Sequence, residues 1–209
     1  GDGEDEIVVN TLDGVVYAWH VDGTEVRDGD GDPSTIGPFY VRAGAKWEWS
    51  RSGPARYDLD GDGAKDIIFG TKNDATGLRR LMALKYDGTD VPGFPYITSG
   101  AITADPCVGD LDDNGQVEIV FFDNAGYLYA VQQDGTPYPG FPPAYMGYAA
   151  ATSWVSCPGL ADMDGDGDLD ITAKMQVGTS LYLNAGTPDP LGGPELLPYN
   201  TAGGAVRSL

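Results

Sequence analysis

The chain has few of the residues on which most enzymatic chemistry depends. Its 209 residues include one histidine and two cysteines. Neither a Gly-x-Ser-x-Gly elbow nor a His-Glu-x-x-His motif occurs, so the common signatures of serine hydrolases and zinc proteases are missing. The single histidine, His20, lies in a predicted strand, where we expect a structural role. These absences predict a noncatalytic protein, although two carboxylates far apart in the chain can still form a glycosidase pair.

Basic residues are also scarce. Lysine and arginine number 12 against 32 aspartates and glutamates, which gives a net charge of −20. This charge argues against nucleic acid and anionic membranes as partners. No apolar run reaches 18 residues, so we expect no membrane insertion. The 31 glycines and 15 prolines are spread evenly, which suits a turn-rich all-β protein and not a low-complexity tract.

An acidic loop recurs along the chain at a fixed interval of 52 residues. The three complete copies span 58–66, 110–118 and 162–170, and a proline lies four residues before each of them. A truncated copy at the N-terminus retains Asp2 and Glu6. Periods of this length are typical of repeat architectures. We therefore divide the chain into repeats at about 1–53, 54–105, 106–157 and 158–209, which together form a single domain or part of one.

The loop has the composition of a cation site. Oxygen-bearing side chains occupy positions 1, 3, 5 and 9, and glycine at position 6 permits a sharp turn. Two like charges about 4 Å apart cost on the order of 4 kcal/mol at an effective dielectric constant near 20, and no lysine or arginine recurs at a position that offsets this repulsion. Calcium takes six to eight oxygen ligands in a flexible cage, whereas magnesium requires a stricter octahedron. The pattern therefore predicts bound Ca²⁺.

We expect three complete calcium sites and a partial fourth, with position 7 contributing its backbone carbonyl. The predicted ligands of the complete sites are Asp58, Asp60, Asp62, Ala64 and Asp66; Asp110, Asp112, Asn114, Gln116 and Glu118; and Asp162, Asp164, Asp166, Asp168 and Asp170. The partial site contains Asp2 and Glu6.

The loop is not an EF-hand. The glutamate that an EF-hand carries at position 12 is replaced by Phe69, Phe121 or Ala173. Short apolar runs rich in β-branched residues follow the loops at 67–69 and 119–122, and these indicate buried strands. In the third repeat we expect strands at 106–109, 119–122, 127–131 and between 145 and 155. Four short antiparallel strands in about 50 residues are typical of a propeller blade.

These residues resemble the FG-GAP/VCBS family of integrin-α-like β-propeller repeats. The resemblance is carried by the acidic loop and the apolar strand after it, then by Leu-Tyr-Ala at 128–130, Asp-Gly-Thr at 134–136 and Gly-Phe-Pro at 140–142. It implies an all-β propeller of four-stranded blades with structural calcium in each strand-connecting loop. It also implies a secreted or cell-surface location.

The function that follows is a calcium-stabilised extracellular module for binding or adhesion, with an unknown protein or carbohydrate as ligand. One alternative is a structural subunit of a surface layer or filament, and a less favoured one is a polysaccharide-active enzyme. Four repeats are few for this family. Either they form part of a larger ring, or the ends close a small ring, with 203–209 adding a strand, or an open blade edge pairs with another chain.

The two cysteines, Cys107 and Cys157, precede successive acidic loops. They either form a disulfide across neighbouring repeats in an oxidising compartment or remain free thiols. Sequence does not distinguish these states, because a disulfide depends on geometry.

Overall fold

The computed structural model describes residues 5–11, 15–27, 37–41, 48–49, 52–73, 79–145, 157–162, 165, 167–174, 179–183 and 197–200. Every regular element in these ranges is a β-strand, which confirms the predicted all-β class. The part of the chain with described positions contains no helix able to cross a membrane. The predicted site residues Asp2, Asp164 and Asp166, the tail 203–209 and most of the strand expected between 145 and 155 lie outside these ranges.

The strands form consecutive antiparallel sheets, which we call blades 1 to 4. Blade 1 consists of β1 (Glu6–Asn10), β2 (Val15–His20) and β3 (Tyr40–Val41). Blade 2 consists of β5 (Ala55–Tyr57), β6 (Asp66–Gly70), β8 (Arg80–Leu84) and β9 (Tyr96–Ile97). A separate pair joins β4 (Glu48–Trp49) to β7 (Lys72–Asn73).

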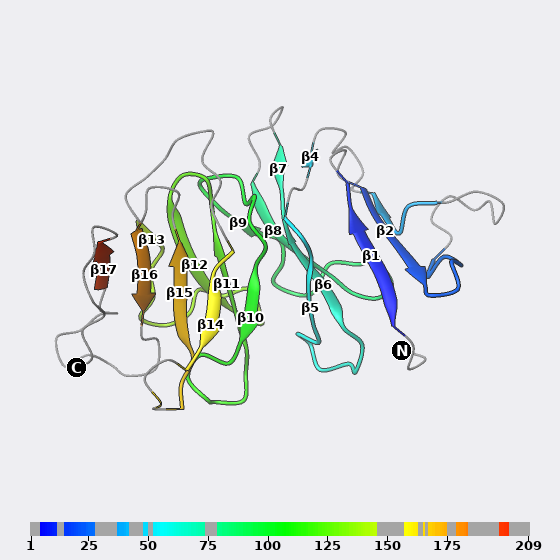
Figure 1. Ribbon diagram of the computed structural model, residues 1–209. Helices are drawn as coiled ribbons and strands as arrows, with labels where there is room; N and C mark the ends of the chain where they lie inside the picture. The colour runs from blue at the N-terminus through cyan, green and yellow to red at the C-terminus, as the bar shows by residue number, and fades with distance from the viewer. Residues whose placement is uncertain are drawn as a thin grey trace.

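Blades 3 and 4 repeat the order of blade 2. Blade 3 consists of β10 (Cys107–Gly109), β11 (Glu118–Phe122), β12 (Tyr127–Gln132) and β13 (Ala144–Tyr145). Blade 4 consists of β14 (Gly159–Ala161), β15 (Asp170–Lys174), β16 (Thr179–Leu183) and β17 (Leu197–Asn200). The blades follow one another in a row, with blade 1 at one end and blade 4 at the other, and the described strands do not close a ring (Figure 1).

The hydrophobic core lies between successive blades because residues along each central strand alternate between two neighbours. In β6, Ile67 and Phe69 belong to a cluster with Val16 and Ala18 of blade 1. Ile68, between them in sequence, belongs to the cluster shared with blade 3. This alternation explains why β6 is buried along its whole length.

Blade 3 uses the same arrangement. Ile119 and Phe121 of β11 pack toward blade 2, and Val120 and Phe122 pack with Ile171 of blade 4. The Phe121 ring stacks on Tyr129 of β12 with centroids 5.0 Å apart. A continuous apolar run in these strands is therefore required, since both faces are covered.

The Asp-Gly-Thr turns after the third strand of blades 2 and 3, and after β2 of blade 1, are built alike. In blade 3, the Asp134 carboxylate accepts hydrogen bonds from the Thr136 amide at 2.9 Å and the Thr136 hydroxyl at 2.6 Å. The glycine between them has a φ of 78°, which favours glycine. These hydrogen bonds lower the pKa of Asp134. The recurring tripeptide therefore stabilises a local turn, and it lies outside the acidic clusters found among the described residues.

Asp123 forms a buried polar junction between blades 2 and 3. One carboxylate oxygen accepts hydrogen bonds from the Gly100 amide, the Ser99 hydroxyl and the Tyr129 hydroxyl at 2.7–2.8 Å. The other accepts the amides of Ala125 and Tyr127 at 3.0 Å. Five donors satisfy a carboxylate with no exposed surface, so this charge is stabilised without a metal.

Candidate metal centre

The acidic loops connect the first and second strands of blades 2, 3 and 4, at the positions expected from the repeat. The β5–β6 and β10–β11 connections lie at the same edge of the row of blades (Figure 1). The position-6 glycines Gly63, Gly115 and Gly167 have φ values of 89°, 85° and 103°. Their left-handed backbone agrees with the expectation that a side chain is disfavoured there.

The fourth position of the loop also adopts a left-handed conformation. It is occupied by Gly61, Asp113 and Gly165, with φ values of 75°, 51° and 82°. Aspartate tolerates this region better than most residues with a Cβ atom. The left-handed backbone at position 6 was expected from the sequence, whereas that at position 4 was not.

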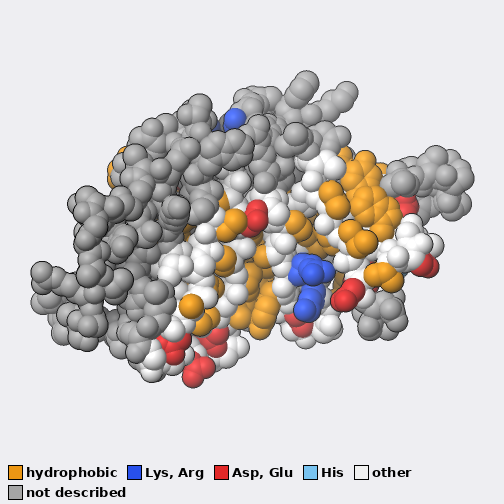
Figure 2. All heavy atoms as spheres, in the orientation of Figure 1, with side chains coloured by type: hydrophobic (Ala, Val, Ile, Leu, Met, Phe, Trp, Pro, Cys, Tyr) orange, Lys and Arg blue, Asp and Glu red, His pale blue; other side chains and the backbone are white. Residues whose placement is uncertain are grey.

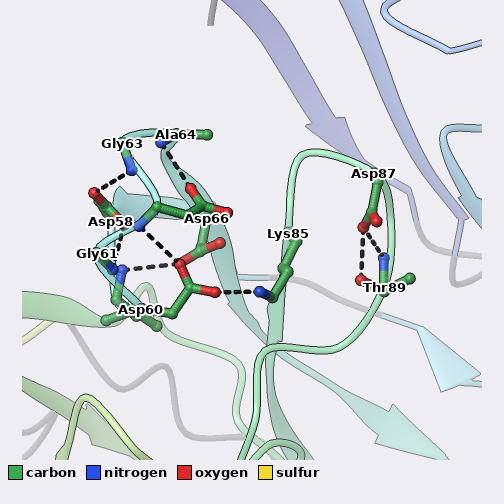
Figure 3. Close-up of polar contacts among 11 residues, drawn as sticks. Asp58, Asp60, Gly61, Gly63, Ala64, Asp66, Lys85, Asp87 and Thr89 are labelled. Atoms are coloured by element: carbon green, nitrogen blue, oxygen red, sulfur yellow. Dashed lines mark hydrogen bonds and ion pairs between the residues drawn. The ribbon is translucent and has the colours of Figure 1, made fainter.

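Backbone amides hold the first carboxylate of the loop in blade 2. Asp58 accepts hydrogen bonds from the amides of Gly61, Asp62 and Gly63 at 2.8, 3.1 and 2.9 Å (Figure 3). The Asp66 carboxylate, from the start of β6, accepts the Leu59 amide at 2.8 Å. These bonds fix the positions of two charged groups before any ligand enters.

The loop of blade 2 gathers three carboxylates. Asp58, Asp60 and Asp66 each contribute an oxygen, and these three atoms all lie within 4.8 Å of one another. Asp66 is 1% exposed, so its carboxyl group is almost completely removed from water. Asp62 lies outside this cluster and accepts the Ala64 amide at 2.8 Å.

A lysine contacts one side of the blade 2 cluster. Lys85, the residue that follows β8, forms an ion pair with the Asp60 carboxylate (Figure 3). The corresponding residues in blades 1 and 3 are His20 and Gln132, so this cation does not recur. Because Lys85 does not recur, the repeat pattern gives no sign of this counter-charge.

The loop of blade 3 forms an equivalent cluster from Asp110, Asp112 and Glu118, whose contributing oxygens also lie within 4.8 Å of one another. Asp110 accepts the amides of Asn114 and Gly115 at 3.1 and 2.7 Å. Glu118 has no exposed surface, and one of its oxygens accepts the Leu111 amide at 2.9 Å.

Two oxygens of the blade 3 cluster are buried without a hydrogen-bond partner. They are Oε1 of Glu118 and Oδ1 of Asp112. An unpaired buried charge is strongly unfavourable in a protein, because the lost hydration is not replaced. A hard cation between these oxygens would supply the missing partner, and oxygen donors are the ligands that calcium and magnesium prefer. The residues present thus fit a divalent cation.

The pKa values of the two buried carboxyl groups, Glu118 and Asp66, are raised, which agrees with a deficit of positive charge around them. Burial raises the pKa of Glu118 to about 7, and the neighbouring carboxylates of Asp112 and Asp110 act in the same direction. The hydrogen bond from the Leu111 amide lowers the pKa but does not offset these effects. Burial and the surrounding aspartates raise the pKa of Asp66 to about 6. Without a cation, both groups bind protons more strongly than carboxyl groups in water.

The third loop is described only in part. Asp162 accepts the Gly165 amide at 2.6 Å and the Gly167 amide at 3.2 Å, as Asp58 accepts the equivalent amides of Gly61 and Gly63. Asp170 is 1% exposed at the start of β15, in the place of Asp66 and Glu118. Asp168 is half-buried. The predicted third site therefore keeps its position-1 and position-9 residues in equivalent places, and it stays a prediction as a whole.

The truncated N-terminal copy has a different environment. Glu6 lies 3.8 Å from the Nδ1 atom of His20 and belongs to β1, which pairs with β2. Its predicted partner Asp2 lies outside the described residues. The partial fourth site therefore stays a prediction, and His20 is placed by the β1–β2 ladder.

Comparison with known proteins identifies the repeat. Residues 110–173, which include the acidic loops of blades 3 and 4, match the model of the FG-GAP-like repeat. The chain carries an FG-GAP-like repeat. The predicted resemblance is thereby confirmed, and the four-stranded sheets have the form expected of FG-GAP blades. No curated protein matches the chain.

Two solved structures are distantly similar to the chain. A protein of unknown function from Bacteroides caccae has 9% identity and a TM-score of 0.47 over 94% of this chain and 57% of its own. The structure of BBS1N in complex with ARL6DN, soaked with lead, has 11% identity and a TM-score of 0.41 over 86% of this chain and 61% of its own. The chain thus spans less than two thirds of the length of either structure.

Proposed function

We propose that the protein is a noncatalytic, calcium-stabilised extracellular module for binding or adhesion. The observation that carries the proposal is the pair of buried, unpartnered oxygens on Asp112 and Glu118 within a three-carboxylate cluster. Calcium at millimolar extracellular concentrations is sufficient to occupy sites with dissociation constants of about 10⁻⁴–10⁻³ M. In this role the ion would hold the first two strands of a blade together and offset their negative charge.

Each loop would contribute ligands from two parts of the blade. Asp110 and Asp112 precede the turn, whereas Glu118 begins β11. An ion bound to all three would connect the loop to a strand whose side chains fill the core on both faces. Calcium would therefore stabilise blade packing, and catalysis is not required to explain the cluster.

Thermal unfolding with and without calcium tests this function. We expect millimolar CaCl₂ to raise the melting temperature of the chelator-treated protein, because an ion that binds only the folded state shifts the unfolding equilibrium. MgCl₂ at the same concentration controls for ionic strength and charge screening. Equal melting temperatures in calcium, magnesium and chelator would contradict the proposal.

A second candidate function, association with another blade-containing surface, is favoured by one face of blade 1. Ile7 and Val9 of β1 are 52% and 42% exposed. Their counterparts in β6, Ile67 and Phe69, are 5% and 4% exposed because blade 1 covers them. Blade 1 thus presents at its free face the side chains that blade 2 buries.

The aromatic residues of β2 extend the same face. Tyr17 and Trp19 stack with centroids 5.5 Å apart, and both are only half-buried. Figure 2 shows hydrophobic atoms gathered over the end of the molecule where Figure 1 places β1 and β2. By analogy with the other blades, this surface fits the aliphatic face of another FG-GAP blade.

Blade 4 is a poorer match for this surface. The pairs Val120–Ala130 and Phe122–Leu128 of blade 3 correspond in register to Thr172–Tyr182 and Lys174–Ser180 in blade 4. At these positions the sequence of blade 4 is partly polar, whereas that of blade 3 is apolar. For this reason we favour the binding or adhesion module over the filament or surface-layer role.

Sedimentation velocity over a range of protein concentrations tests the second candidate. Association through the free face of blade 1 predicts that Ile7→Lys lowers the associated fraction. Val21→Lys is the matched control, since Val21 is 64% exposed but belongs to the turn after β2. A monomeric wild type at every concentration, or equal effects of both substitutions, would contradict self-association.

A further inference from the structure

The two cysteines lie where the innermost strands of neighbouring blades meet. Gly53 and Asp105 are the residues that precede the recurring proline in blades 2 and 3. They lie side by side, because the Gly53 amide donates a hydrogen bond to the Asp105 carboxylate. Cys157 occupies this position in blade 4. Cys107 follows the proline of blade 3 and begins β10.

A direct contact connects the two cysteine segments. The Cys107 thiol donates a hydrogen bond to the carbonyl of Pro158, the residue bonded to Cys157. On the other side, the Cys157 thiol interacts with Asp105, which is two residues before Cys107. Each thiol therefore lies against the backbone segment that carries the other cysteine.

Both thiols are free in the structure, and they differ in access to solvent. Cys157 is exposed and Cys107 is half-buried. Burial is the main cause that raises the pKa of Cys107 to about 11, and the nearby Cys157 sulfur acts in the same direction. The Cys107 thiol therefore lies close enough to Cys157 for that residue to affect its pKa. The chain has no third cysteine, so an intramolecular pairing is unique.

We propose that Cys107 and Cys157 form a disulfide under oxidising conditions and thereby fasten blade 3 to blade 4. The exposed Cys157 thiolate attacks a small-molecule disulfide such as glutathione disulfide, breaks its S–S bond and releases one thiol. The Cys107 thiolate then attacks the Cys157 sulfur in the mixed disulfide and releases the second thiol. Both protein sulfurs are oxidised, glutathione disulfide is reduced, and the two protons end on the released thiols.

The cross-link would connect two blades that otherwise adhere through side-chain packing. It closes a loop of roughly 50 residues, and loops of this length give substantial stabilisation when cross-linked. For a chain of this size we expect the melting temperature to rise by about 5–10 °C on oxidation. A secreted protein encounters the oxidising compartments in which such bonds persist.

The test uses the full chain, first reduced and then incubated with glutathione disulfide at pH 8.5. Thiol titration in denaturant should fall from two thiols to none, the mass should decrease by two hydrogens, and peptide mapping should recover a Cys107–Cys157 cross-link in the monomer. The melting temperature of the oxidised protein should fall again on reduction. The single variants Cys107→Ser and Cys157→Ser control for glutathione adducts and dimers.

Three results would overturn the proposal. They are persistence of both thiols, a mass increase from stable glutathione adducts without a cross-link, and a disulfide between two chains. If either serine variant fails to fold, thiol titration and peptide mapping of the wild type still decide the question. Calcium does not enter the test, so its outcome is independent of the proposed metal sites.

Discussion

The Lys85 ammonium group forms an ion pair with the Asp60 carboxylate, so the acidic cluster of blade 2 already has a partial counter-charge. The equivalent strand end in blade 3 carries Gln132, which leaves the cluster around Glu118 without a comparable cation. Two loops with the same ligand pattern thus have different electrostatic environments. If calcium binds both, Lys85 competes with it in one loop only.

Replacing the lysine should strengthen calcium binding to the blade 2 loop. Because solvent screens the Lys85–Asp60 pair, its effect is modest, and we expect Lys85→Gln to lower the calcium dissociation constant of this site by about two- to fivefold. Isothermal titration calorimetry at fixed ionic strength measures the change.

Lys72→Gln makes the same change in net charge within β7 and serves as the control. We expect it to leave the dissociation constant nearly unchanged. Equal tightening by both substitutions would show that net charge, and not the Lys85–Asp60 contact, determines the affinity.

The raised pKa values of Glu118 and Asp66 predict how the stability of the fold depends on pH. The pKa of Glu118 rises from 4.5 to about 7, and that of Asp66 from 3.8 to about 6. Between the unfolded and folded values the native state binds more protons than the unfolded state, so stability decreases as pH rises through this window. In chelator, we expect a higher melting temperature at pH 5 than at pH 8.

Calcium should reverse this dependence, since it binds the deprotonated carboxylates. Melting temperatures in saturating calcium should therefore not fall between pH 5 and pH 8, and calcium affinity should weaken as pH decreases through about 7 and 6. A Glu118→Gln variant isolates the part due to Glu118. Identical pH profiles in calcium and chelator would contradict the assignment of these groups to the cation site.

Sequence was sufficient to predict the strands because their pattern is set by local rules. Apolar runs such as 119–122 follow a turn-forming loop, and β11 is found at Glu118–Phe122. The expected third strand of that repeat, 127–131, corresponds to β12 at Tyr127–Gln132. What the pattern did not reveal is which neighbour each face contacts, since this depends on blade order in space. The exposed Ile7 and Val9 of blade 1 emerged only from the structure.

The acidic cluster was predictable for a similar reason, since its ligands are close in sequence. Positions 1, 3 and 9 do converge in blades 2 and 3. Lys85 lies 25 residues from Asp60 and occupies a position that is histidine or glutamine in neighbouring blades, so no sequence signal indicated it. The left-handed conformation of Asp113 was also not predicted, because an aspartate in the sequence does not indicate a left-handed backbone as a glycine does.

That conformation gives a direct test of the loop geometry. With a φ of 51° at position 113, a β-branched residue would be strained, and we expect Asp113→Val to lower the free energy of unfolding by about 1–2 kcal/mol. Asp113→Asn removes the same charge but tolerates this backbone, so its effect should stay within about 0.5 kcal/mol. Urea unfolding in chelator measures both, and equal destabilisation would contradict the loop conformation.

The junction at Asp123 should be more sensitive than any exposed aspartate. Its carboxylate accepts five hydrogen bonds, whereas an asparagine amide offers one acceptor oxygen and leaves buried donors unpaired. We expect Asp123→Asn to destabilise the fold by about 2–4 kcal/mol. Asp134→Asn, in an exposed turn, should cost about 1 kcal/mol or less. Similar losses for both variants would show that burial of Asp123 does not govern its contribution.

Calcium stoichiometry in the wild type and in Glu118→Gln tests the central claim most directly. The glutamine keeps the shape of the side chain but removes the charge that completes the blade 3 cluster. In the absence of metal, the same substitution also removes a buried carboxylate that is energetically unfavourable. We predict that calorimetric titration shows one calcium ion fewer for the variant, while its melting temperature in chelator equals or exceeds that of the wild type. Equal stoichiometry in the two proteins, or no calcium binding by either, would contradict the account.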